Sequence, residues 1–117
     1  MGASIMAYMN QFSTSNGTTD VTILSAPAAS TSRTIPAGGI CIANLDTATI
    51  NVTLQIKDNT TDRVLYNDIE LQADDSWTNA KSVHVLDATN QTLEIYLAGA
   101  VTTTEADISV MYRDEAQ

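Results

Sequence analysis

The clearest feature of the chain is a set of stretches in which apolar and polar residues alternate strictly. In residues 49–57, four aliphatic side chains alternate with polar ones. Because successive side chains of a β-strand point to opposite faces, this period of two predicts a strand with one buried and one solvated face. The pattern recurs in residues 91–97 and 106–113, and we expect a strand in each.

Shorter apolar runs fill much of the remaining chain, and turn residues separate them. They cover residues 21–24, 32–35, 40–44, 63–66, 68–71 and 81–86. In the last run, we expect Val83 and Val85 to face the core and His84 to face solvent. About seven to nine short strands at this spacing are typical of a β-sandwich or a small barrel. We predict an all-β fold: an antiparallel β-sandwich, jelly-roll-like or immunoglobulin-like, over residues 20–117.

The first 19 residues differ from the rest of the chain. Their first half is apolar, and their second half is polar and without periodicity, as in an arm or a linker. Chain termini are ordered when they dock onto something. We predict that residues 1–19 form an N-terminal arm that grips a neighbouring subunit, with a frayed end as the alternative. The candidate partner-binding residues are Ile5, Met6, Tyr8, Met9 and Phe12.

The charge balance and the cysteine count narrow the classes of partner. The chain carries 14 acidic and five basic residues, a net charge of −9. Nucleic acids and anionic membranes attract Lys and Arg, so we expect neither as a partner. A single cysteine, Cys41, allows no internal disulfide, and we expect it to behave as a small buried apolar residue. We expect no signal peptide, and no apolar stretch approaches the about 18 residues of a membrane helix.

Residues that carry chemistry are scarce. His84 is the only histidine, and one cysteine with one histidine cannot make a zinc site. No Gly-x-Ser-x-Gly or phosphate-loop motif is present. We therefore predict that the protein is not an enzyme and has no cofactor and no metal site.

Two weaker alternatives for a binding site remain open. Loop carboxylates such as those of Asp58 and Asp62 are the ligand type that calcium prefers. Exposed aromatic rings, here those of Trp77, Tyr66 and Tyr96, could form a platform for a carbohydrate. For Trp77, a position in the core between two sheets is the other interpretation.

The order of these elements resembles that of a known group of proteins. The run Arg-Thr-Ile-Pro-Ala-Gly-Gly at residues 33–39 precedes a strand ending in Ala-Asn, then a long alternating strand and a polar loop. The segment Ile-Glu-Leu-Gln-Ala-Asp-Asp-Ser at residues 69–76 and three further strands follow. This pattern, over roughly residues 20–113, resembles the small β-sandwich structural proteins of tailed-bacteriophage virions. It departs from them at residues 73–75, where Ala-Asp-Asp replaces the usual Gly turn.

The resemblance implies a virion component that acts by contact. Such proteins decorate or cement the capsid by binding the major capsid protein, or sit at the head-to-tail junction or on the tail. It implies a homo-oligomer, which we expect to be a trimer, located in the virion and in the host cytoplasm before assembly. A carbohydrate-binding β-sandwich module is the alternative from another class.

Overall fold

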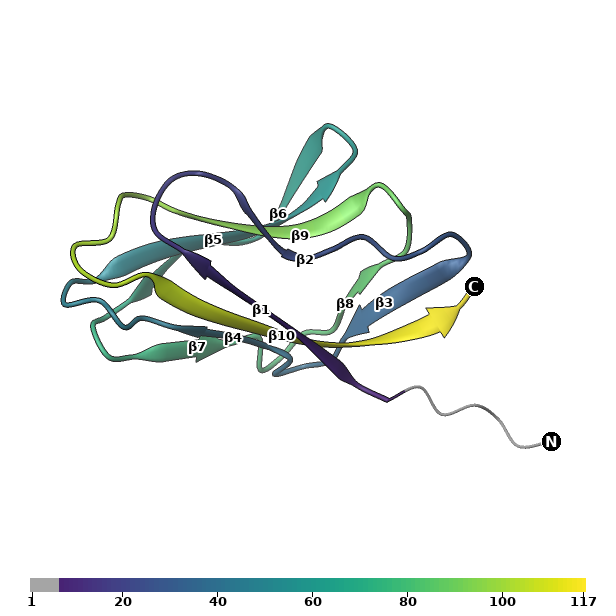
Figure 1. Ribbon diagram of the computed structural model, residues 1–117, viewed down its shortest axis with the longest axis horizontal. Coiled ribbons are helices and arrows are strands. Elements are labelled where there is room, and N and C mark those ends of the chain that lie inside the picture. Colours follow the sequence, from purple (N-terminus) through teal and green to yellow (C-terminus); the bar gives the residue numbers. More distant parts are fainter. Residues whose placement is uncertain (1–6) are drawn as a thin grey trace.

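The computed structural model describes residues 7–117 and contains ten β-strands (Figure 1). Ile5 and Met6 of the predicted arm lie outside the described residues. The strands are β1 Met9–Ser15, β2 Val21–Leu24, β3 Thr31–Ile35, β4 Ile40–Ala43, β5 Ile50–Asp58, β6 Thr61–Leu71, β7 Ser76–Thr78, β8 His84–Leu86, β9 Gln91–Leu97 and β10 Ala106–Ala116.

The strands form two antiparallel sheets that pack together, which confirms the predicted β-sandwich. One sheet has six strands, in the order β7-β4-β10-β3-β8 with β1 paired to β10, and the other has the order β2-β9-β5-β6. Residues 7–117 form ten strands, where about seven to nine were expected for the chain. The additional strands β1 and β7 lie where the sequence indicated an arm and a loop. The runs at 63–66 and 68–71 join into the single strand β6.

Strand β10 organises the six-stranded sheet. β4 pairs with residues 107–110 of β10, and β3 pairs with residues 113–116, both antiparallel. β3 and β4 therefore lie end to end along one edge of β10, while β1 follows the other edge. Between β3 and β4, the backbone N–H of Met111 donates to the carbonyl of Gly39 at 2.8 Å and continues the ladder.

The core lies between the two sheets. Sixteen buried hydrophobic residues form it, among them the fully buried Leu54 of β5 and Ile95 of β9. Burying an aliphatic side chain of this size stabilises the fold by about 1.5–3 kcal/mol. Among the described residues, β1 contributes none of these sixteen side chains.

The structure overturns the prediction for the strand around His84. Val83 and Val85 are 58% and 44% exposed, whereas His84 is half-buried and Leu86 is fully buried. His84 and Leu86 lie two residues apart and therefore share the inner face of β8. The sequence placed the valines inside because a strand of six residues was assumed. Only three residues pair with β3, and burial of Leu86 decides which face turns inward.

The side chains of two buried asparagines form hydrogen bonds with backbone groups of the loops and strand ends that have no partner in a strand ladder. The side chain of Asn79 accepts a hydrogen bond from the N–H of Ile40 at 2.8 Å and donates to the carbonyls of Pro36 and Ser82. Asn44, also fully buried, donates to the carbonyl of Leu71 at 2.9 Å. Buried backbone groups outside a ladder need such partners.

Candidate functional site

The N-terminal strand β1 is the edge of the six-stranded sheet. Its seven residues pair antiparallel with residues 106–112 of β10, in a continuous register from Met9 opposite Tyr112 to Ser15 opposite Ala106. Within the described residues, β10 is its only strand partner. The second half of the predicted arm is thus an ordered edge strand in this structure, with one edge of its backbone unpaired by any other strand of the described chain.

The side chains of β1 have an inverted polarity. The residues opposite the buried Ile108 and Val110 are Ser13 and Gln11, so polar side chains face the core. Phe12 lies on the other face and is 72% exposed. A strand at the edge of a sandwich ordinarily turns its apolar side chains inward. The exposed ring of Phe12 is therefore the feature of β1 that needs a functional explanation.

The serines of β1 that face the core are also poorly matched to their surroundings. Ser15 is 1% exposed, and the hydroxyl oxygens of Ser13 and Ser15 are buried without a hydrogen-bond partner among residues 7–117. A buried hydroxyl without a partner costs about 1–3 kcal/mol. The side chains of β1 therefore hold the strand on the sandwich only weakly, and its backbone ladder supplies most of the attachment.

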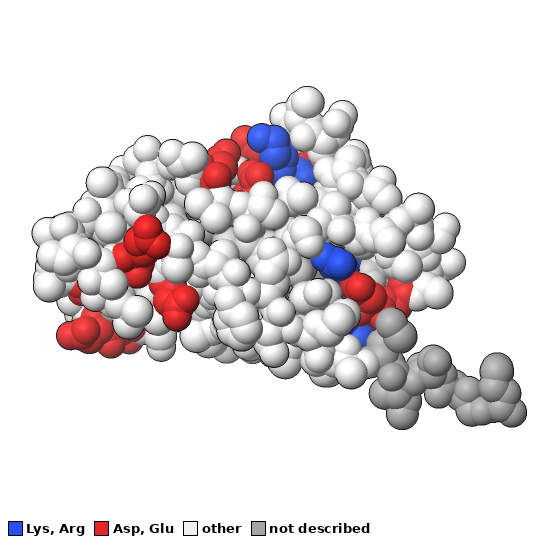
Figure 2. All heavy atoms as spheres, viewed as in Figure 1, with Lys and Arg blue, Asp and Glu red and all other residues white. Residues whose placement is uncertain are grey.

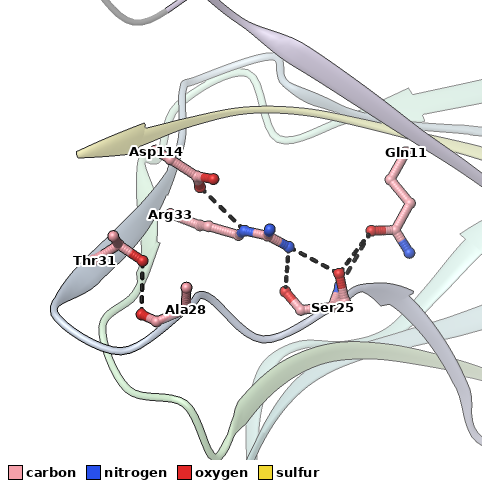
Figure 3. A network of polar contacts seen from close by, with 6 residues as sticks. All are labelled: Gln11, Ser25, Ala28, Thr31, Arg33 and Asp114. Carbon is pink, nitrogen blue, oxygen red and sulfur yellow. Dashed lines mark hydrogen bonds and ion pairs between the residues drawn. The ribbon is translucent and has the colours of Figure 1, made fainter. Parts of the chain in front are cut away.

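One polar network ties β1 to the rest of the molecule (Figure 3). The side-chain oxygen of Gln11 accepts a hydrogen bond from the N–H of Ser25, which follows β2, at 3.1 Å. Ser25 in turn accepts from the guanidinium of Arg33 through its hydroxyl and its carbonyl. Arg33 forms an ion pair with Asp114 of β10, with 3.0 Å between Nε and Oδ1. Gln11 is thus the polar anchor of β1 at this end of the sandwich.

Directly across the sheet from Phe12, the outer face carries a row of small uncharged residues, and Asp107 and Met111 of β10 flank this row. By register, Phe12 lies opposite Ser109 of β10, Ser109 lies opposite Cys41 of β4, and Cys41 lies opposite Thr78 of β7. Cys41 is half-buried on this face, less enclosed than expected. Figure 2 shows the side of the molecule along which β1 runs, and few charged side chains lie in the middle of that side. The exposed ring of Phe12 beside this row is of the aromatic type that protein–protein interfaces favour.

The structure describes three of the five candidate partner-binding residues. Tyr8 is 47% exposed, directly before β1, and by alternation it shares the outer face with Phe12. The guanidinium carbon of Arg113, which the sequence did not single out, lies 5.5 Å from the centre of the Tyr8 ring. Met9 is 40% exposed and lies on the opposite face, at the margin of the sandwich. The structure thus places Tyr8 and Phe12 on the same face of the strand and Met9 on the other face.

Asp46, which lies between β4 and β5, fixes two loops together. Asp46, which is 2% exposed, accepts hydrogen bonds from the backbone N–H groups of Thr102, Thr103 and Thr104 and from the Thr103 hydroxyl. The N–H of Thr102 contributes most to holding the pKa of Asp46 well below its ordinary value, and burial opposes the shift. The carboxylate is satisfied by these donors, so its role is structural.

The aromatic residues do not gather into one surface. The rings of Tyr66 and Trp77 meet edge to face with 4.8 Å between their centres, and both are half-buried between the sheets. The hydroxyl of Tyr66 forms a 2.8 Å hydrogen bond with Nε2 of His84, whose pKa is lowered by burial. Tyr96 lies opposite Thr53 on the outer face of the four-stranded sheet, away from this pair.

Within residues 7–117, no three His, Cys, Asp or Glu side chains gather as they would to hold a metal ion. Of the loop carboxylates considered for calcium, that of Asp58 forms an ion pair with Arg63, with 3.1 Å between Oδ2 and Nε. No helix in the described part of the chain is long and apolar enough to cross a membrane.

Comparison with known proteins gives a likeness of fold. No family model matches the chain, and no curated protein sequence matches it. Among solved structures, the chain is similar to a structure described as "Bacillus endospore appendages form a novel family of disulfide-linked pili", with 13% sequence identity and a TM-score of 0.51. That match covers 96% of this chain and 87% of the other. The nucleoplasmin-like N-terminal domain of Drosophila FKBP39 matches with 7% identity and a TM-score of 0.41, over 100% of this chain and 97% of the other.

Proposed function

We propose that this protein is a non-enzymatic structural subunit of a larger assembly, and that it binds its neighbours through β1 and the outer face of the six-stranded sheet. The observation that carries the proposal is the exposed ring of Phe12, on a strand whose polar side chains face the core. Leaving a large ring in water forgoes about 1.5–3 kcal/mol of burial. A partner surface that covers Phe12 and Tyr8 would recover it.

Two further observations favour contact over chemistry as the mode of action. The ionisable groups described above are engaged in structural roles, as the bonds of Asp46 and the His84–Tyr66 pair illustrate. The fold is also similar to that of a protein from a structure described as Bacillus endospore appendages that form disulfide-linked pili.

For the assembly itself, we propose a tailed-phage virion, with this protein as a decoration or cement protein on the major capsid protein. A place at the head-to-tail junction or on the tail is the alternative within the same assembly. The support is the order of strands and turns over residues 20–113, which resembles that of such virion proteins. The proposed location is the virion, and the host cytoplasm before assembly, with a homotrimer as the proposed oligomer.

The test begins with particles purified from the phage that encodes the chain. We expect mass spectrometry to detect the protein in them, and immunogold labelling to place it on the capsid surface. Labelling at the neck or tail would favour the alternative position. Absence of the protein from purified particles would contradict the proposal.

A variant then tests the proposed surface. Particles that lack the protein are incubated with purified wild type, Phe12→Ser or Val64→Ser, and bound protein is measured by sedimentation. Val64 is a matched control because it is 52% exposed and lies on β6 of the other sheet. We expect Phe12→Ser to weaken binding by about 10–100-fold, which corresponds to the loss of one buried ring, and Val64→Ser to bind normally. Equal binding by all three proteins would rule out the surface around Phe12.

A further inference from the structure

We propose that β1 is an exchangeable strand: in the assembly, residues 7–17 of one copy dock on β10 of a second copy, in the register that β1 has here within one chain. The inference rests on the proposed function, because it names the contact by which one assembly subunit holds a second copy. The partner is therefore this same chain, and the binding site is the edge of β10 that faces β1.

The first argument is that β1 is held on its own sandwich by few side-chain contacts. Its buried hydroxyls, those of Ser13 and Ser15, have no partner within residues 7–117. Within the described part of the chain, the polar side-chain contacts of the segment are those of Gln11 with Ser25 and, just before the strand, of the Tyr8 ring with Arg113. The ladder of seven residue pairs with β10 remains, and a second copy offers the same ladder. Release of β1 therefore breaks few contacts, and docking on another copy forms the same contacts again.

The second argument is that the rest of the sandwich is complete without β1. All sixteen buried hydrophobic residues of the described core come from other parts of the chain. On its opposite edge, β10 keeps its pairing with β4 at residues 107–110 and with β3 at residues 113–116. A sandwich that has released β1 thus keeps its core and presents one open strand edge, which is a ready template for another strand.

The third argument is the position of a natural hinge. The carbonyls of Asn16 and Gly17 accept hydrogen bonds from the N–H groups of Val101 and Leu97, each at 3.0 Å, so these two residues belong to the docked segment. Residues 18–20 follow, and all three are exposed. The chain can reverse its direction there, which would carry residues 7–17 to a neighbour while β2 stays in place. Short connections of this type are where strand exchange between copies takes place.

Charge favours a second copy as the occupant. The chain has a net charge of −9, yet residues 1–19 contain no charged side chain. Like-charged copies repel one another over most of their surface. The exchanging segment is the neutral part, so it can cross to a neighbour without adding to this repulsion. A ladder built within one chain is also complementary to any other copy of that chain.

The test traps the strand in place with a disulfide. Thr14 and Asp107 face each other in register on the outer face, and both are exposed. The N–H of Met111 points towards β4, so the outer-face pairs of β1 and β10 are the non-hydrogen-bonded ones. Such pairs have Cα atoms about 4.5 Å apart, within the range that a disulfide spans. The variant carries Thr14→Cys and Asp107→Cys in a Cys41→Ser background, with the single Thr14→Cys variant in that background as control.

Heavy-isotope and light copies of the double variant are mixed, concentrated, separated by size, oxidised, and analysed on a denaturing non-reducing gel. We expect a covalent dimer in the oligomeric fraction, with a heavy peptide joined to a light one between positions 14 and 107. An intrachain link alone, in monomers or in oligomers, would overturn strand exchange. If the intrachain link were found in oligomers, only strand exchange would be refuted. The proposed assembly role would remain, because the presence of the protein in purified particles tests it separately.

Two variants test whether exchange proceeds through release of β1. Ser15→Ala removes a buried hydroxyl without a partner, so β1 should open more slowly, by about tenfold. Gln11→Ala removes the contact with Ser25 and should speed opening by about tenfold. Both variants leave the dimer-to-monomer ratio at equilibrium unchanged, because the contacts of β1 are the same in either state. Equal exchange rates in the wild type and both variants would overturn the proposal.

Discussion

Replacement of Asn79 by alanine should destabilise the sandwich more than any change of a surface residue. The side chain is 2% exposed and serves three backbone groups at once: it accepts from the N–H of Ile40 and donates to the carbonyls of Pro36 and Ser82. Alanine leaves all three without this partner. The interaction matters because it holds the broken edge between β3 and β4 against β10.

The magnitude follows from the burial of each partner. Ile40 is fully buried, so its N–H would be left unpaired at a cost of about 1–3 kcal/mol. The carbonyls of Pro36 and Ser82 lie on half-buried residues, where water can replace part of each bond, so each adds about 0.5–1.5 kcal/mol. We expect a total loss of about 4 kcal/mol in the free energy of unfolding. For a chain of 117 residues this lowers Tm by about 15 °C.

Urea denaturation followed by the fluorescence of Trp77 measures this loss, because the indole is half-buried against the ring of Tyr66. The control is Asn90→Ala, an exposed turn position, for which we expect a change within about 0.5 kcal/mol. The slope of the free energy with urea should stay the same in both variants. A loss below about 1 kcal/mol for Asn79→Ala would refute the reasoning, since the backbone groups would then have found other partners.

Three further changes have defined outcomes. Because the pKa of Asp46 is lowered in the folded state, its carboxylate stabilises the fold above about pH 4 and loses this effect as the pH falls further. Asp46→Asn should therefore lower Tm at neutral pH, and the Tm of this variant should decrease less in acid than that of the wild type. Burial lowers the pKa of His84, so stability should fall as the pH drops below about 6.5, and NMR titration should show the shift. Gly39→Ala should destabilise the fold by about 1–3 kcal/mol, because a Cβ there would lie 2.9 Å from the carbonyl oxygens of Met111 and Pro36.

Each of these changes has an outcome that contradicts it. If the Tm of Asp46→Asn fell as steeply in acid as that of the wild type, other carboxylates would be responsible for the loss of stability at low pH. A His84 pKa at or above its ordinary value would show that the ring is solvated. For Gly39→Ala the control is Gly99→Ala, where a Cβ meets no atom within 4 Å, and equal stability of the two variants would refute the steric argument.

The regular part of the fold could be predicted from the sequence because burial on one face leaves a period of two. Residues 49–57 and 91–97 showed that period, and they became the central strands β5 and β9 of the four-stranded sheet. Short strands give too few repeats to fix a face. β8 has only three residues, and Val85 within it and Val83 before it suggested the wrong inner face. The burial of Leu86 sets the face that turns inward.

The candidate site was only partly predictable. The apolar residues near the N-terminus indicated a contact segment, but the sequence could not show that Phe12 belongs to a strand of the sheet. Its neighbours Asn10, Ser13 and Thr14 are polar on both faces, so they give no period. The contact of Arg113 with Tyr8 joins residues 105 positions apart, and no local pattern reports such a pairing.

The antiparallel pairing of β1 with β10 also determines how the protein would respond to mechanical load. β1 begins at Met9 beside Tyr112, and β10 ends just beyond, at Ala116, so both strand ends lie at the same end of the ladder (Figure 1). A pull on these two ends opens the hydrogen bonds one after another, like a zipper, because the bonds lie across the strands. A pull on opposite ends would load all of them together in shear. Tension applied between the Met9 end of β1 and the Ala116 end of β10 should therefore open the β1–β10 ladder at a lower force than a pull in shear.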